Sequence, residues 1–161
     1  MADTQQTDRA GVTAADAARE LLARPPQPGY DVVRLADDLI SVAQHYGSLE
    51  LEAVVAGDAR AVVVRGEPSI ALPGSGPMRL FRPLLARLAV LGADETGTAC
   101  DPYRATFVLV RSARGGPVRL AVELTNTPSV QRLSIARTEL TVRSAPQVAP
   151  APPSAPVTAS V

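Results

Sequence analysis

The sequence predicts an α+β domain in which an antiparallel sheet carries its helices on one face. Three observations lead to this prediction. Apolar residues recur every three or four positions in three segments, as along an amphipathic helix. In six other segments they alternate with polar residues, as in strands that have one face against a core. Short turns join these strands in two runs of three, which favours antiparallel hairpins and the order αα-βββ-α-βββ.

The first two helices are expected at 13–23 and 31–46. Thr13 is a suitable N-cap, and Asp16 follows three residues later, where the helix dipole favours a carboxylate. The prolines of segment 24–29 (RPPQPG) should end the first helix. The second helix has a wide apolar stripe, so we expect it to pack on the sheet.

The first three strands are predicted at 48–53, 60–65 and 69–72. Glu50 and Glu52 fall on one strand face, which we interpret as solvated. The Gly-rich segment 73–77 (PGSGP) lacks the spacing of a phosphate loop and is interpreted as a linker. A helix should follow at 78–91, beginning near Pro83 or kinked there.

The last three strands are predicted at 103–112, 118–125 and 130–143, after a polar loop at 92–101. Segment 114–117 (RGGP) should form a hairpin turn, because its glycines can adopt positive φ. Segment 126–129 (NTPS) should form the second turn.

Domain organisation follows from composition. Residues 13–143 are predicted to form a single domain. The polar residues 1–12 and the Pro/Ala-rich residues 144–161 are predicted to be disordered, because neither segment has a helical or strand period.

The composition argues against several kinds of enzyme. All 16 basic residues are arginine, and the chain has one histidine and one cysteine. A P-loop or a Schiff base needs a lysine, and a zinc site needs several His or Cys ligands. His45 is interpreted as a helix-end cation and Cys100 as an incidental thiol. We therefore expect no catalytic residues, no metal and no cofactor.

Charge and hydropathy indicate the compartment and the partners. The formal net charge is zero, the arginines are spread along the chain, and aromatic residues make up 3%, a pattern that disfavours nucleic-acid binding. No apolar run approaches the length of a membrane span, and the polar N-terminus does not read as a signal peptide. The expectation is a cytoplasmic protein without direct membrane insertion.

Five strings carry a resemblance to a known domain: 43–53 (AQHYGSLELEA), 61–68 (AVVVRGEP), 84–94 (LLARLAVLGAD), 101–107 (DPYRATF) and 118–137 (VRLAVELTNTPSVQRLSIAR). In order and pattern they resemble the second N-terminal domain of the ATPases of type II secretion and type IV pilus assembly. That regulatory domain is PAS-like. The resemblance spans roughly residues 31–137, and the chain lacks the ATPase domain that follows in the family.

The resemblance implies which arginines matter. Arg65, Arg104 and Arg137 fall where the family has arginines, which are thought to help complete a neighbour's nucleotide site. Two other family arginines fall at Val63 and Ala121, and their loss puts that role in doubt.

Two functions are therefore kept open. The first is a non-catalytic interaction and regulatory domain that binds a protein partner, a secretion or pilus ATPase or its platform. The alternative is a sensor that binds an anionic ligand or nucleotide through Arg65, Arg104 and Arg137, because arginine suits phosphate and carboxylate recognition. Further arginines lie on the predicted helix (Arg79, Arg82, Arg87) and on strands with Arg104 and Arg137 (Arg119, Arg132), all expected to face solvent. A merely solvated sheet face would account for the strand arginines too.

Overall fold

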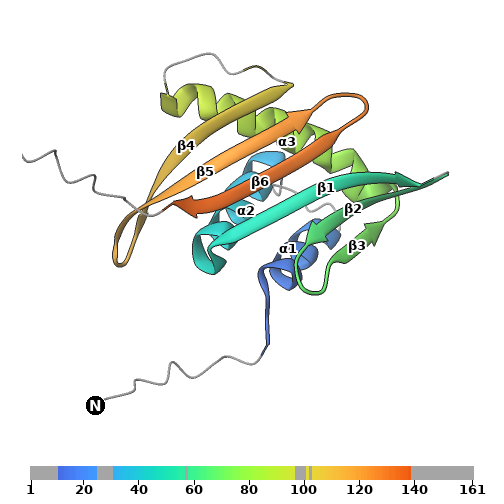
Figure 1. Cartoon of the computed structure of the whole chain (residues 1–161), viewed down its shortest axis with the longest axis horizontal. Coiled ribbons are helices and arrows are strands. Elements are labelled where there is room, and N and C mark those ends of the chain that lie inside the picture. The colour runs from blue at the N-terminus through green and yellow to red at the C-terminus, as the bar shows by residue number, and fades with distance from the viewer. Residues whose placement is uncertain (1–10, 25–30, 57, 97–100, 102, 139–161) are drawn as a thin grey trace, which may run out of the picture.

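The computed structural model describes residues 11–24, 31–56, 58–96, 101 and 103–138. It has three helices packed on one face of a six-stranded antiparallel sheet, in the predicted order αα-βββ-α-βββ (Figure 1). The helices are α1 (Ala14–Ala23), α2 (Val32–Tyr46) and α3 (Ser75–Thr96). The strands are β1 (Ser48–Ala56), β2 (Ala59–Arg65), β3 (Ile70–Pro73), β4 (Arg104–Ala113), β5 (Gly116–Asn126) and β6 (Gln131–Thr138).

The first two helices begin at the predicted caps. Thr13 and Asp16 form a capping box, in which each side chain accepts a hydrogen bond from the other residue's backbone N–H. At the start of α2, the carboxylate of Asp31 accepts from the N–H groups of Val33 and Arg34. Gly47, with φ of 94°, ends α2 and donates its N–H to the carbonyl of Ala43.

Helix α3 is longer at both ends than the sequence predicted. It begins at Ser75 and passes through Pro83, so the predicted start near Pro83 is wrong. The helix also continues past Gly92, where the sequence predicted a polar loop. Gly92 is a packing residue, because a Cβ there would lie 2.5 Å from Cδ1 of Phe107.

The sheet has the strand order β3-β2-β1-β6-β5-β4. The last strand therefore pairs with the first in the middle of the sheet, with Leu51 opposite Leu133. One edge is β3, which is short. The other edge is β4, which is ten residues long.

The core lies between the sheet and the helices. The apolar residues that alternate along the strands face this layer and are buried, as are the inward faces of all three helices. The largest fully buried side chains are Phe81, Leu22, Leu35, Leu39, Ile40, Leu51, Leu84, Leu85, Leu88, Leu109, Leu120 and Leu133. Figure 1 shows that the three helices lie behind the sheet, so the front face of the sheet is not covered by any of them.

Two predictions lie outside the described residues. These are the disorder of residues 1–12, except for Gly11 and Val12, and the disorder of the tail at 144–161. The extension of the last strand from 139 to 143 lies outside them as well.

Candidate interaction surface on the open face of the sheet

The face of the sheet opposite the helices is called the open face here. Strand alternation places on it every second residue of each strand, and these residues are exposed or half-buried. From β2, β1 and β6 it contains Ala61, Val63, Arg65, Ser48, Glu50, Glu52, Val54, Arg132, Ser134 and Ala136. From β5 and β4 it contains Arg119, Ala121, Glu123, Thr125, Arg104, Thr106, Val108 and Val110.

A band of charge crosses the middle of the open face. The strand register aligns Val63, Glu52, Arg132, Thr125 and Arg104 in one row across the sheet. The adjacent row, in the same strand order, is Arg65, Glu50, Ser134, Glu123 and Thr106. Acidic and basic side chains alternate in this band, so neighbouring strands can pair opposite charges.

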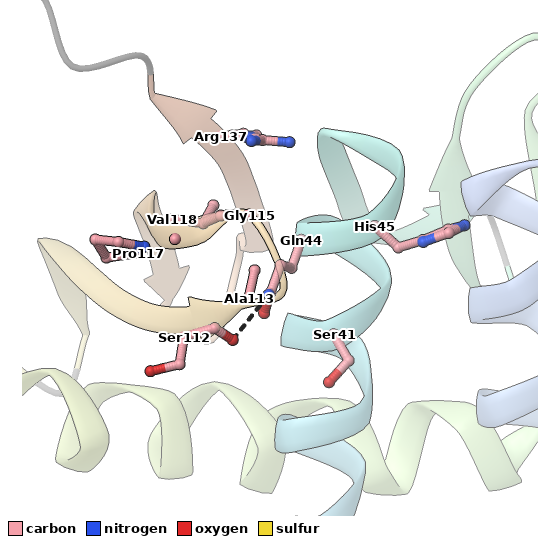
Figure 2. Close-up of a pocket in the computed structure, with 10 residues that line it drawn as sticks. Ser41, Gln44, His45, Ser112, Ala113, Gly115, Pro117, Val118 and Arg137 are labelled. Carbon is pink, nitrogen blue, oxygen red and sulfur yellow. Dashed lines mark hydrogen bonds between the residues drawn. The ribbon is translucent and has the colours of Figure 1, made fainter.

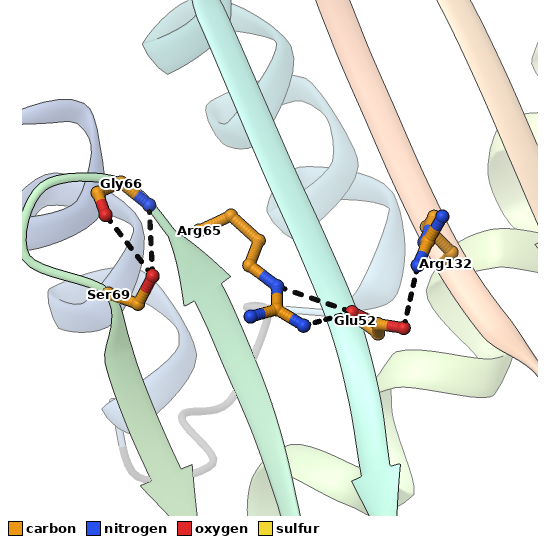
Figure 3. Close-up of polar contacts among 5 residues, drawn as sticks. All are labelled: Glu52, Arg65, Gly66, Ser69 and Arg132. Atoms are coloured by element: carbon orange, nitrogen blue, oxygen red, sulfur yellow. Dashed lines mark hydrogen bonds and ion pairs between the residues drawn. The ribbon is translucent and has the colours of Figure 1, made fainter.

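Glu52 is the centre of the band. Its Oε2 accepts hydrogen bonds from Nη2 of Arg65 at 2.5 Å and from Nε at 3.2 Å. Its Oε1 accepts from Nη2 of Arg132 at 2.8 Å, as Figure 3 shows. The side chain of Glu52 is only 19% exposed, whereas those of Arg65 and Arg132 are 49% and 61% exposed. Three strands, β2, β1 and β6, are thus joined by one carboxylate.

The two arginines also change the protonation of Glu52. The hydrogen bond from Arg65, followed by that from Arg132, lowers the pKa of the Glu52 carboxyl below its ordinary value. The same bond to Glu52 raises the pKa of Arg132. The network is therefore fully charged at neutral pH.

Small apolar residues flank the charged band. Ala121 lies opposite Ala136 and Val108, and Val110 lies further along β4. Val108 and Val110 are 41% and 50% exposed. Around Ala121, Ala136 and Val108 the side chains are small, so another backbone or flat surface can approach this part of the face closely, beside Arg119.

The three arginines that the sequence singled out do not converge. Arg65 and Arg104 are both on the open face, but β1, β6 and β5 lie between their strands, which places the backbones about 19 Å apart at the usual strand spacing. Arg137 is on the opposite face, since its register partner is the buried Leu120. Arg137 is exposed, as predicted, but it does not share a sheet face with Arg132, because five positions separate them and strand faces alternate.

Arg137 instead lies at a cavity of about 660 Å³ between α2 and the β4–β5 hairpin (Figure 2). The amide of Gln44 crosses this cavity and donates to the carbonyl of Ser112 at 3.3 Å. The hydroxyl of Ser41 donates to the carbonyl of Asp37 one turn earlier in α2, an ordinary helical contact. No activated nucleophile is formed by these groups.

The other candidate residues have modest surroundings. His45 lies in the last turn of α2, as predicted, and points away from the hairpin toward α1 (Figure 2). It also lines the shallow space between α1 and α2. Cys100 lies outside the described residues.

Arg104 lines a shallow hollow of about 310 Å³ on the open face. The hollow also contains Arg132 and Glu123, together with the hydroxyls of Thr106, Thr125 and Ser134. Spacing along the sequence does not link Arg104 to Arg132 or Glu52 to its two arginines. Strand register creates both groupings, and no local sequence signal specifies the pairing of β1 with β6.

Two findings concern metal ligands and membrane-spanning helices in the described part of the chain. No three His, Cys, Asp or Glu side chains there are grouped to hold a metal ion. None of the described helices is long and apolar enough to cross a membrane.

The resemblance to the regulatory domain of secretion and pilus ATPases stays a prediction after comparison with known proteins. No family model matches the sequence, and no curated protein matches it.

Proposed function

We propose that the protein is a non-catalytic interaction and regulatory domain whose open face binds a partner protein. The observation that carries the proposal is an entire sheet face that none of the described helices covers. In addition, that face has balanced charge and small apolar flanks. Protein interfaces commonly combine apolar contact with paired polar groups, and the open face has both.

The Glu52 network prepares this face for binding. Arg65 and Arg132 are already held by a shared carboxylate, so less side-chain freedom is lost when a partner contacts them. Their remaining N–H groups can donate to carbonyls or carboxylates of the partner, because both side chains are partly exposed. A partner with carboxylates spaced across a flat surface would fit this band.

The proposed partner is a secretion or pilus ATPase or its platform, on the strength of the sequence resemblance. The order of helices and strands agrees with that of the resembling domain, which is consistent with this assignment and does not test it.

The second candidate function is an anion sensor. Its original form, a site made by Arg65, Arg104 and Arg137, has little support because these side chains lie apart. A second version of the anion site, in which Arg104 and Arg132 bind an anion in the open-face hollow, is supported because both residues line that hollow. Glu123 and Glu52 oppose it by supplying negative charge at the same place.

The experiment compares two variants that gain the same side chain. Ala121→Arg places bulk and charge on the open face, and Val90→Arg places them on the exposed side of α3. The tagged 161-residue chain and both variants are used as baits in lysate of the source organism, and captured proteins are quantified by mass spectrometry. We expect a secretion or pilus ATPase, or its platform, to be captured by wild type and Val90→Arg and to be lost with Ala121→Arg.

Two results would contradict the proposal. Capture of the same proteins by all three baits would show that the open face is not the binding surface. Open-face-dependent capture of unrelated proteins would reject the proposed partner while keeping the surface.

A further inference from the structure

A second cluster of arginines lies away from the open face, around a cavity of about 690 Å³. Its basic residues are Arg60, at the start of β2, and Arg79 and Arg82, in the first turns of α3. The described lining also includes Gly74, Asp58 and Gln131. The sequence predicts Arg79 and Arg82 on one helix, and the fold adds Arg60 from the sheet.

Backbone contacts bring the three arginines together. Gly74 donates its N–H to the carbonyl of Arg60 at 3.3 Å, which holds the start of α3 against the start of β2. The amide of the buried Asn126 donates to the carbonyl of Arg82 at 3.4 Å and ties α3 to the end of β5. The arginines are thus on ordered elements rather than on a loop.

The cavity carries excess positive charge. None of its three guanidiniums is paired with a carboxylate within the described residues, where the ion pairs involve other arginines. Asp58 is the one acidic residue of the described lining, so three positive charges face one negative charge. The 22-residue helix α3 adds its positive end, and Gly74 before it has no side chain to accept from the first-turn N–H groups.

We propose that this cavity binds a small molecule through a phosphate group held by Arg60, Arg79 and Arg82. A phosphate has three terminal oxygens that can accept from several directions, whereas a carboxylate has two oxygens in one plane. Arginines from two elements therefore match phosphate better than carboxylate. The cavity is larger than one phosphate needs and falls in the size range of small-molecule sites, so the ligand has a second part beside Asp58 and Gln131.

The test uses inorganic phosphate as the probe and citrate as a carboxylate probe, titrated into the full-length protein at constant ionic strength. Binding is followed by the NMR amide signals of Ser75 and Gly76. The variant pair Arg79→Gln/Arg82→Gln is matched by Arg114→Gln/Arg119→Gln, which removes the same charge from the β4–β5 hairpin region. The amide spectrum of each variant also shows whether it is folded.

We expect saturable phosphate shifts, binding weaker by about tenfold or more in Arg79→Gln/Arg82→Gln, and little change in the matched pair. Asp58→Asn should tighten phosphate binding, because it removes the opposing charge. Shifts that do not saturate, equal weakening in both pairs, or citrate binding as tightly as phosphate would overturn the proposal. The result of this phosphate test does not depend on whether the open face binds a partner protein, since Arg60, Arg79 and Arg82 do not lie on that face.

Discussion

Glu52 shows how one side chain organises a surface. Its two arginine partners are 13 and 80 positions away in the sequence, and both reach it from neighbouring strands. Exposed ion pairs contribute little to stability individually. The value of this network is geometric, because it fixes the charges that a partner meets at the centre of the open face.

We predict that Glu52→Gln lowers the free energy of unfolding by about 1 kcal/mol at neutral pH, through loss of two partly exposed ion pairs. In the native state the pKa of Glu52 is lowered from the ordinary value of 4.5. The stabilisation is therefore complete above that value and is lost as the pH falls through the lowered pKa. Urea denaturation of both proteins should show a difference in free energy of unfolding at neutral pH that disappears at acidic pH.

Glu50→Gln is the matched control, because Glu50 lies on the same strand face without a hydrogen bond to either arginine. Glu50→Gln should lower the free energy of unfolding at neutral pH by less than Glu52→Gln does. A stability loss for Glu52→Gln that does not change with pH would contradict a stabilising role of the charged Glu52 carboxylate.

At the scale of elements, α3 fixes the sheet through close packing and one ion pair. Gly92 receives the ring of Phe107 from β4, and Arg111 of β4 donates to Glu95 of α3 at 2.9 Å. The helix thereby supports β4, an edge strand whose other face carries part of the open face.

We predict that Gly92→Ala destabilises the protein by about 1–3 kcal/mol, despite the higher helix propensity of alanine. The new methyl group would lie 2.5 Å from the Phe107 ring, so the helix or the strand must move. Gly76→Ala in the same helix meets nothing within 4 Å and should not destabilise. Thermal denaturation of both variants compares them directly, and equal stability would show that the α3–β4 contact is not tight.

The fold was predictable because its signals are local. Apolar spacing located all three helices, and the alternation along the strand that became β5 correctly predicted that Arg119 faces solvent. The end of α3 was missed because Gly92 looks like a helix terminator in the sequence, whereas in the structure its lack of a side chain leaves room for the Phe107 ring of β4.

The candidate site was less predictable because it depends on strand register. Alternation alone placed Glu52 on the solvent side, yet its pairing with Arg132 requires β6 to return beside β1. Because β6 pairs with both β1 and β5, three strands lie between Arg65 on β2 and Arg104 on β4. Neither relation has a counterpart in the spacing of residues along the chain.

At the scale of the whole molecule, β6 unites two halves of the sheet. It pairs with β1 on one side and with β5 on the other, so the first and second β-runs share one hydrophobic layer. A fold closed by its last strand should unfold as a unit, because removing β6 breaks both pairings.

We therefore predict that a chain limited to residues 13–143 unfolds in a single cooperative transition. Its free energy of unfolding should lie within about 1 kcal/mol of the full chain, because every described helix and strand lies inside these bounds. Urea denaturation followed by far-UV and near-UV circular dichroism tests this. Two separate transitions, or loss of cooperativity in the shorter chain, would contradict it.

The most direct test of the central proposal is site-specific photo-crosslinking in cells of the source organism. A photoreactive residue is placed at Val108 on the open face or at Val90 on the outer side of α3, two positions of similar exposure. If the open face binds a partner protein, Val108 gives a discrete crosslinked product and Val90 does not. Equal crosslinking from both positions, or a product from Val90 alone, would contradict the proposal that the open face is the binding surface.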